Sequence, residues 1–386
     1  MAPRFINIKT VEELERLTGR PCPVEQGEAL RQVMERFPVR LTPHLVELCR
    51  RSPAVAAQFL PDPRELQRDQ GQEYCFKGLL PTGVAGVERM YPDRCIIMPR
   101  PACPAYCRFC FRKFYEHGGA AAPLSRQALA AAVDYVAAHP ELREVLITGG
   151  EPAQDHKALE FLLVGLRRLD HVGPIRVACR SLVTAPDVVD HRLVQLLRDH
   201  QHLSRGQPVE VAAHINHTDE LTPPTEAALC ALRLAGIHVY NQAVLLRGIN
   251  STPRPMLSLL GSLRRLGVEA YNIFFGGPVQ GMDHLRPSLG EALALKAALR
   301  RHATGRANPH LIVTTRLGKV ELGVDGQVVE REPCSRWVWI STPYTLTGLR
   351  ELSPDFALPA DARLEQDGTI TMRYLDGPPR PLEDAR

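Results

Sequence analysis

The 386-residue chain contains very little lysine: six of its 47 basic residues are lysine, and the others are arginine. Arginine replaces lysine readily on a protein surface, but its guanidinium keeps its proton and cannot form a Schiff base. Each lysine is therefore a candidate for chemistry that needs an amine. The six are Lys9, Lys77, Lys113, Lys157, Lys296 and Lys319.

Other absences exclude whole classes of protein. No apolar run reaches the length of a membrane span, and the first residues lack a basic segment followed by an apolar one, so we expect a cytoplasmic protein that does not bind membranes. Basic and acidic residues nearly balance, 47 against 43, without long blocks of one sign, which gives no reason to expect nucleic acid as a partner. A hydrophobic content of 44% allows a substantial core and argues against disorder of the bulk of the chain.

Ten cysteines are present, and in the cytoplasm they should be reduced, so a cluster of them indicates metal binding or redox chemistry. Cys103, Cys107 and Cys110 have the spacing CxxxCxxC in PACPAYCRFCFRKFY. Three thiolates on one loop can hold three irons of a cubane and leave the fourth iron open. Zinc is the alternative, but structural zinc normally has four protein ligands, and no second CxxC or CxxH pair lies nearby. The other cysteines are expected to be buried small hydrophobes: Cys22, Cys49, Cys75, Cys95, Cys179, Cys230 and Cys334.

Three regions are expected: a helical N-terminal arm over 1–88, a barrel over 89–319 and a small C-terminal extension with β-like runs over 320–386. In the barrel region, short β-branched runs predict strands at 95–98, 144–149, 175–179, 209–215, 239–246, 269–275 and 310–314. Amphipathic segments between them predict helices at 125–139, 156–169, 186–200, 225–236, 255–267 and 290–302. This alternation indicates right-handed βαβ units and a parallel sheet. The predicted fold class is α/β, a partial (β/α)6-type barrel with its active site at the carboxyl ends of the strands.

The cysteine loop directly follows the first predicted strand, and the aromatic Phe109 precedes its last cysteine. The glycine-rich segment TGGEP (148–152) ends the second strand. Together these features resemble the radical S-adenosylmethionine (SAM) enzymes. The resemblance implies a [4Fe-4S] cluster on the three clustered cysteines, with SAM bound to the open iron and cleaved to a 5′-deoxyadenosyl radical. It also implies that SAM lies against Gly149, Gly150 and Glu151.

A narrower resemblance, from about residue 42 to 319, is to the lysine 2,3-aminomutase family. It is carried in order by MYPDRCIIMPRPACPAYCRFCFRK, VLITGGEP, RVACRSLVTAP, AAHINHTDELT, VYNQAVLLRGIN and GMDHLRP. The resemblance implies an isomerase that uses pyridoxal 5′-phosphate (PLP) and moves an amino group from C2 to C3 of an α-amino acid. In HLIVTTRLGKVEL it makes Lys319 the Schiff-base lysine, and Arg112 the residue that holds the substrate carboxylate. It further implies PLP phosphate contacts from Tyr91 and Arg94, and SAM contacts from Arg180, His214 and Gln242.

The chain departs from the family pattern around PLP and zinc. Met90 replaces an arginine beside the phosphate, where the adjacent Arg89 is a candidate substitute, and the glycine loop before Lys319 is two residues shorter. Thr252 replaces an earlier zinc-binding cysteine and no cysteine follows Cys334, so we expect no structural zinc.

The substrate site departs as well. Lysine-specific members hold the distal ammonium with two aspartates, for which this chain has Gly277 and Thr314. An unpaired buried ammonium costs several kcal/mol, so free lysine is not the expected substrate. Two alternatives remain: a neutral or aliphatic side chain in an apolar pocket, or an acidic side chain met by Arg316.

Two other functions are compatible with the sequence. One is a PLP-independent radical SAM enzyme such as an epimerase or dehydrogenase, and the other is a non-catalytic iron–sulfur protein. The aminomutase resemblance implies a small-molecule amino acid substrate, an external electron donor of the flavodoxin or ferredoxin type, and a homo-oligomer.

Overall fold

The computed structural model describes residues 5–67, 80–114 and 122–379. A nine-stranded sheet forms its centre, in the order β11-β10-β9-β8-β7-β6-β5-β4-β3. Strands β4 to β10 are parallel, and β3 and β11 pair antiparallel at the two edges. The strands are β3 Val87–Arg89, β4 Arg94–Arg100, β5 Glu144–Gly149, β6 Ile175–Cys179, β7 Val209–Ala213, β8 His238–Leu245, β9 Glu269–Phe275, β10 His310–Thr315 and β11 Gly318–Glu321.

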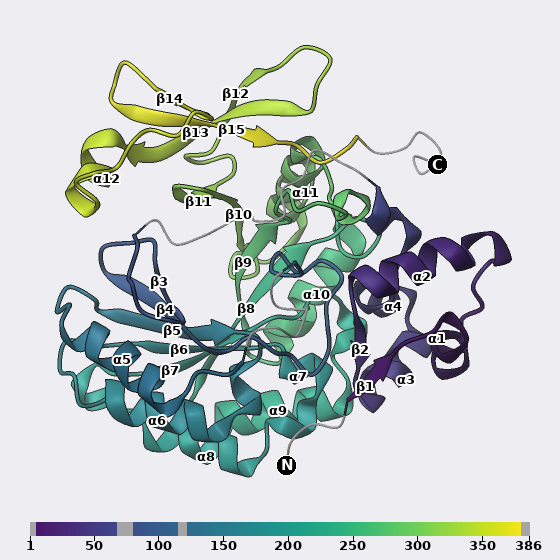
Figure 1. Ribbon diagram of the computed structural model, residues 1–386, viewed down its shortest axis with the longest axis horizontal. Helices are drawn as coiled ribbons and strands as arrows, with labels where there is room; N and C mark the ends of the chain where they lie inside the picture. The colour runs from purple at the N-terminus through teal and green to yellow at the C-terminus, as the bar shows by residue number, and fades with distance from the viewer. Residues whose placement is uncertain (1–4, 68–79, 115–121, 380–386) are drawn as a thin grey trace.

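Helices cover the outer face of this curled sheet (Figure 1). They connect successive parallel strands and are α5 Arg126–Ala137, α6 His156–Leu166, α7 Ser181–Thr184, α8 His191–Asp199, α9 Pro223–Leu234, α10 Pro253–Arg265 and α11 Leu289–His302. The prediction of a partial barrel with helices between parallel strands is confirmed. The predicted strands 144–149, 175–179 and 269–275 have the observed bounds.

Alternation along the strands separates the core from the inner face of the sheet. In β4, for example, Cys95 and Ile97 are buried under the helices, while Arg94 and Ile96 face the concave side. Successive strand side chains point to opposite faces, so each strand contributes to both surfaces. The concave surface therefore collects side chains from many strands.

The N-terminal arm has a small core of its own. Strands β1 (Ile6–Ile8) and β2 (Val39–Leu41) pair antiparallel, and four helices pack with them: α1 Val11–Thr18, α2 Gly27–Arg36, α3 Pro43–Arg51 and α4 Pro53–Phe59. Ala105 of the cysteine loop is buried in the same apolar cluster. The arm thus packs directly on the loop that carries the clustered cysteines.

The C-terminal extension is a four-stranded antiparallel sheet in the order β12-β13-β15-β14, with one helix. Its elements are β12 Val328–Arg331, β13 Trp337–Thr345, α12 Leu346–Leu352, β14 Ala362–Leu364 and β15 Thr369–Leu375. Strands β3 and β11, which hydrogen bond to the barrel sheet, each span one of the boundaries expected between the three regions.

The cysteines outside the CxxxCxxC loop differ in how far they are exposed to solvent. Cys49, Cys95 and Cys179 are buried as predicted, but the prediction is wrong for Cys230 and Cys334, which are exposed, and for the partly exposed Cys22. Cys230 lies on α9 and Cys334 in the turn before β13, and neither belongs to the apolar core of the barrel in the described residues. Cys75 lies outside the described residues. No helix in the described ranges is long and apolar enough to cross a membrane.

Candidate active site

A cavity of about 440 Å³ opens on the concave side of the barrel. Its lining includes the three clustered cysteines and the residues expected to contact SAM, PLP or the substrate carboxylate: Tyr91, Arg94, Cys103, Cys107, Cys110, Arg112, Gly149, Gly150, Glu151, Arg180, His214, Gln242 and Lys319. These residues lie far apart in sequence and meet because the carboxyl ends of parallel strands share one edge of the sheet.

The cysteine loop runs between β4 and α5 and is fixed by backbone hydrogen bonds. Cys110 N–H donates to the carbonyl of Cys107 at 3.2 Å, and Arg108 N–H donates to the carbonyl of Gln58 in the arm at 2.8 Å. Burial raises the pKa of the Cys107 thiol, and the neighbouring Arg180 guanidinium opposes this shift. In the described ranges no three His, Cys, Asp or Glu side chains are grouped tightly enough for a single metal ion. A cubane differs, because its three thiolates bind three separate irons.

The two glycines after β5 allow the cysteine loop to approach. Gly149 has a φ of 105°, in the left-handed region that disfavours side chains. A Cβ on Gly150 would lie 2.4 Å from the carbonyl oxygen of Ala102. Both glycines therefore have a packing role, whatever they contact in the cavity.

Glu151 joins the ends of two strands. Its carboxylate accepts hydrogen bonds from the backbone N–H groups of Arg180 and Ser181, both at 2.7 Å. Burial raises the pKa of Glu151 to about 7, and those backbone hydrogen bonds act in the opposite direction. The side chain thus ties the glycine segment after β5 to the start of α7 after β6.

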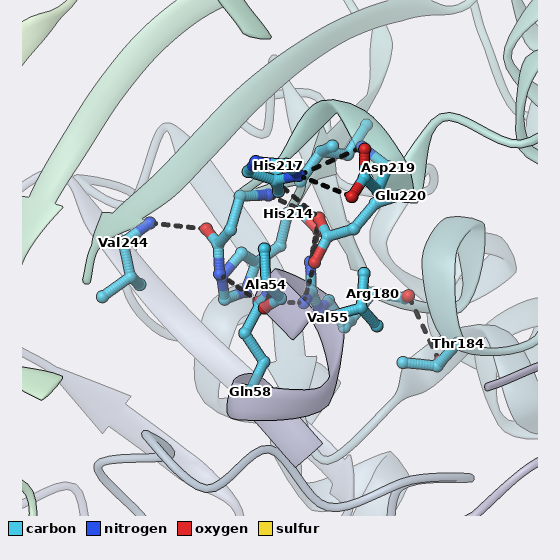
Figure 2. Close-up of polar contacts among 12 residues, drawn as sticks. Ala54, Val55, Gln58, Arg180, Thr184, His214, His217, Asp219, Glu220 and Val244 are labelled. Carbon is cyan, nitrogen blue, oxygen red and sulfur yellow. Dashed lines mark hydrogen bonds and ion pairs between the residues drawn. The ribbon is translucent and has the colours of Figure 1, made fainter. Parts of the chain in front are cut away.

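Arg180 and His214 lie side by side at the carboxyl ends of β6 and β7 (Figure 2). Arg180 Nη2 donates to Glu220 Oε1 and to Gln58 Oε1, each at 2.9 Å, and Arg180 Nη1 donates to the carbonyl of His214. Desolvation and the adjacent Arg180 charge lower the pKa of His214 well below its usual value, which keeps the imidazole neutral. Arg180 Nε and His214 Nε2 are buried and have no hydrogen-bond partner among the described residues. Such orphaned polar atoms in a cavity wall fit a polar ligand.

Lys319 lies on β11, opposite Thr314 of β10, and not in a loop. Its side chain is exposed to the open cavity, with Nζ 5.1 Å from the centre of the Phe274 ring. Desolvation lowers the pKa of Lys319 to about 8, helped by the positive charges of Arg176 and Arg94. No hydrogen bond or ion pair engages this amine in the part of the chain that the structure describes. An amine with this pKa is partly neutral near physiological pH and able to act as a nucleophile.

The phosphate candidates lie next to Lys319. Arg94 stacks on Tyr91, with its guanidinium carbon 4.1 Å from the ring centre. Arg89 does not occupy the place left by Met90, because its guanidinium is buried and donates to the carbonyls of Tyr91 and Pro92. Arg89 therefore supports the loop that carries Tyr91.

Arg176 is a cavity residue that the sequence reasoning missed. It is the second residue of β6, ion-paired with Glu144 and 3.3 Å from the hydroxyl of Tyr240. Its Nε is buried without a partner in the described residues. The alternation of IRVAC, with Ile175, Val177 and Cys179 in the core, would have placed Arg176 on the concave face.

Part of the cavity lining is apolar. Phe111, Phe274, Phe275, Gly276, Gly277 and Thr314 border it, and buried Arg112 lies beside Phe111 with its guanidinium carbon 5.0 Å from that ring centre. Arg316 does not border the cavity; it is half exposed, and its Nε lies 3.6 Å from Asp361 Oδ2 in the C-terminal extension. The structure therefore does not support the alternative of an acidic substrate side chain met by Arg316, because the turn between β10 and β11 directs this residue outward.

The cavity lining is strongly cationic. Its positive side chains are Arg89, Arg94, Arg112, Arg176, Arg180 and Lys319, and its carboxylates are Glu88 and Glu151. Glu151 is occupied by backbone amides, and Glu88 lies on edge strand β3, at the opposite edge of the sheet from Gly277 and Thr314. Three thiols on one loop fit a cluster with one open iron, and the cations fit the carboxylates and phosphate of SAM, substrate and PLP.

Comparison with known proteins finds close counterparts over most of the chain. An L-lysine 2,3-aminomutase from Acetoanaerobium sticklandii is 30% identical over 79% of this chain and 73% of that protein. A protein from Aquifex aeolicus, provisionally named for the same activity, is 31% identical over 81% of this chain and 84% of its own length. A glutamate 2,3-aminomutase from Clostridioides difficile is 29% identical over 82% of this chain and 74% of that enzyme.

Other comparisons add less. No protein-family model matches the chain. Among solved structures, a radical SAM methyltransferase from Sphaerobacter thermophilus aligns with a TM-score of 0.42 and 19% identity, over 60% of this chain and 69% of that one. This structural likeness is too low to support an argument. The identity to the aminomutases over most of both chains shows that the protein belongs to the lysine 2,3-aminomutase family of radical SAM isomerases.

Proposed function

We propose that the chain is a SAM- and PLP-dependent 2,3-aminomutase that converts an α-amino acid with an uncharged side chain into the β-amino acid. The observation that carries the proposal is a cationic cavity whose lining contains both an amine with a pKa of about 8 and the three-cysteine loop. A cluster with bound SAM would supply a carbon-centred radical that abstracts hydrogen from substrate, and PLP would supply the conjugated system that stabilises the migrating nitrogen.

The roles of the protein groups follow from their chemistry. Cys103, Cys107 and Cys110 would hold the cluster, and Arg180 and His214 would offer their unpartnered nitrogens to SAM. Lys319 would hold PLP covalently and release it to the substrate amine, which its lowered pKa favours.

Further groups would orient the bound molecules. Arg112 would orient the substrate carboxylate through a bidentate pair. Gly149, Gly150 and Glu151 would form the wall next to the methionine part of SAM, and Gln242 would border it from β8. Tyr91 and Arg94, with Arg176, would surround the PLP phosphate.

An uncharged substrate side chain is favoured by the apolar end of the cavity. A substrate ammonium there would be flanked by phenylalanines, glycines and Thr314, and the carboxylates in the cavity lining are Glu88 and Glu151. Leaving such a charge without a partner is costly.

The deciding experiment incubates anaerobically reconstituted, reduced protein with SAM, PLP and a pool of amino acids in deuterated and normal form. We expect a product with the same mass as one amino acid that has an uncharged side chain. With a deuterated substrate, the product should carry deuterium that has passed through 5′-deoxyadenosine. Lys319→Ala should abolish this product and the absorbance of lysine-bound PLP, while Lys157→Ala, which changes an exposed lysine of α6, should leave both unchanged. Conversion of lysine alone would overturn the substrate class.

A PLP-independent radical SAM reaction is the second candidate, because Arg89 is turned away from the place of the missing arginine. It predicts 5′-deoxyadenosine formation and substrate turnover that do not depend on PLP or on Lys319. The Lys319→Ala variant therefore separates the two functions. In either case the reaction needs an external one-electron donor of the flavodoxin or ferredoxin type.

A further inference from the structure

A buried trio of charges joins the N-terminal arm to the cysteine loop. Glu65, in the one-turn segment Pro63–Leu66 of the arm, is fully buried. Its Oε1 accepts from Arg108 Nε at 2.9 Å, and its Oε2 accepts from Arg108 Nη2 at 2.7 Å and Lys113 Nζ at 2.9 Å. Arg108 lies between the second and third cysteines, and Lys113 follows the third by three residues.

The trio carries one net positive charge in the interior, and both of its cations belong to the segment that carries the three cysteines. Lys113 and Arg108 are each 1% exposed at the side chain, so solvent does not screen them. Lys113 N–H donates to the carbonyl of Cys110 at 3.1 Å, which fixes its position relative to the last cysteine. Lys113 Nζ also lies 4.0 Å from the centre of the Phe37 ring, in contact with the arm.

A second contact from the arm acts on the same loop. Gln58, on α4, accepts the Arg108 N–H with its carbonyl, while its side-chain Oε1 accepts from Arg180 Nη2 and from Asn216 Nδ2 (Figure 2). Arg108 Nη1 further donates to the carbonyls of Phe37 and Pro38. The loop is therefore held by the arm through both its backbone and its charged side chains.

We propose that Glu65 is a positioning residue that fixes the cysteine loop and sets the charge beside the cluster, so that the arm controls the reduction potential of the cluster. The inference rests on the proposed assignment of the three cysteines as cluster ligands. The potential of an iron–sulfur cluster depends on nearby charge, and a positive charge stabilises the reduced, more negative form. In this proposal Lys113 supplies the second positive charge, beside that of Arg108.

The test is a series of variants that change the net charge of the buried trio formed by Glu65, Arg108 and Lys113. Lys113→Met removes one positive charge and places an apolar chain against Phe37, while Glu65 keeps its bidentate pair with Arg108. Glu65→Gln removes the negative charge, and Glu65→Gln combined with Lys113→Met restores the net charge of the wild type. Glu47→Gln, at an exposed glutamate of α3 paired with Arg51, is the control.

Each reconstituted protein is analysed for iron and sulfide content and titrated with redox mediators, with the reduced cluster followed by electron paramagnetic resonance. At one fixed potential we expect the reduced-to-oxidised ratio to rise about tenfold in Glu65→Gln and to fall about tenfold in Lys113→Met, a shift of about 59 mV in each direction for a one-electron couple. The double variant and Glu47→Gln should remain close to the wild-type ratio.

Two results from these variants would contradict the proposed role of Glu65. If Glu65→Gln fails to load a cluster, Lys113→Met still decides, and an unchanged ratio in that variant overturns the proposal. Shifts in the same direction in all three variants would indicate a purely structural role and would also overturn it. If the wild-type protein itself loads no cluster, the proposed function fails instead, so the two failures are distinguishable.

Discussion

The hydroxyl of Tyr91 accepts a hydrogen bond from the backbone N–H of Lys319 at 2.9 Å, across 228 positions of sequence. Tyr91 lies between β3 and β4 at one edge of the barrel sheet, and Lys319 lies on β11 at the other edge. The open barrel is therefore bridged next to its reactive amine. Tyr344 of the C-terminal extension completes the bridge, since its hydroxyl donates to the carbonyl of Lys319 at 2.7 Å.

We predict that Tyr344→Phe loosens the Lys319 backbone without removing the amine. Loss of one such hydrogen bond costs about 0.5–1.5 kcal/mol, which corresponds to a roughly twofold to thirteenfold weaker affinity for PLP if the bridge orders the site. Titration of the apoprotein with PLP, followed by absorbance, measures the effect. Tyr135→Phe is the control, because Tyr135 lies on α5, packs against His139 and is not among the residues that line the cavity. Equal affinities in both variants would show that the bridge does not order Lys319.

The reactivity of Lys319 should depend on pH with a midpoint near 8. The neutral amine is the nucleophile, and burial together with Arg176 and Arg94 lowers the pKa of Lys319 from the ordinary lysine value to about 8. The rate of PLP capture by apoprotein should therefore rise between about pH 7 and 9 and then level off. Stopped-flow absorbance gives this profile. Arg176→Gln should move the midpoint upward, since one neighbouring positive charge is removed; a rate still rising above pH 10 in the wild type would contradict the prediction.

A methyl group at Gly150 should displace the cysteine loop. The added Cβ would lie 2.4 Å from the backbone oxygen of Ala102, and backbone cannot yield as a flexible side chain can. We expect Gly150→Ala to lower the free energy of unfolding by about 1–3 kcal/mol and to reduce iron incorporation. Thermal unfolding and iron analysis measure both effects. Gly305→Ala, whose Cβ meets no atom within 4 Å, should retain full stability and iron content.

A carboxylate at position 314 should change the preferred substrate. Thr314 borders the apolar end of the cavity opposite Lys319 on the neighbouring strand. In Thr314→Asp we expect kcat/KM for uncharged substrates to fall by about tenfold or more, because a carboxylate in this apolar part of the cavity disfavours an apolar side chain, and activity with a basic amino acid to appear. Competition assays with mixed substrates reveal the change. Thr314→Asn, equal in size but neutral, should gain no activity with basic substrates.

Sequence pattern was sufficient where the signal is local. The spacing of Cys103, Cys107 and Cys110, and the alternation of segments such as IRVAC, depend only on neighbouring residues, and they predicted the cysteine loop and the parallel strands. The same alternation also predicts that Arg176 faces away from the core, since a core residue flanks it on each side in the strand.

Tertiary structure decided the rest, because contacts between distant segments leave no local periodicity. No residue near Lys319 in the sequence indicates that its backbone N–H and carbonyl hydrogen bond to the hydroxyls of Tyr91 and Tyr344. The outward direction of Arg316 follows from the turn between β10 and β11, and the pairing of Glu65 with the cysteine loop depends on how the arm docks. The sequence by itself determined the family to which the chain belongs and supplied the candidate residues for its chemistry. Only the folded chain determined which charges surround it, since burial and neighbouring strands set their strength.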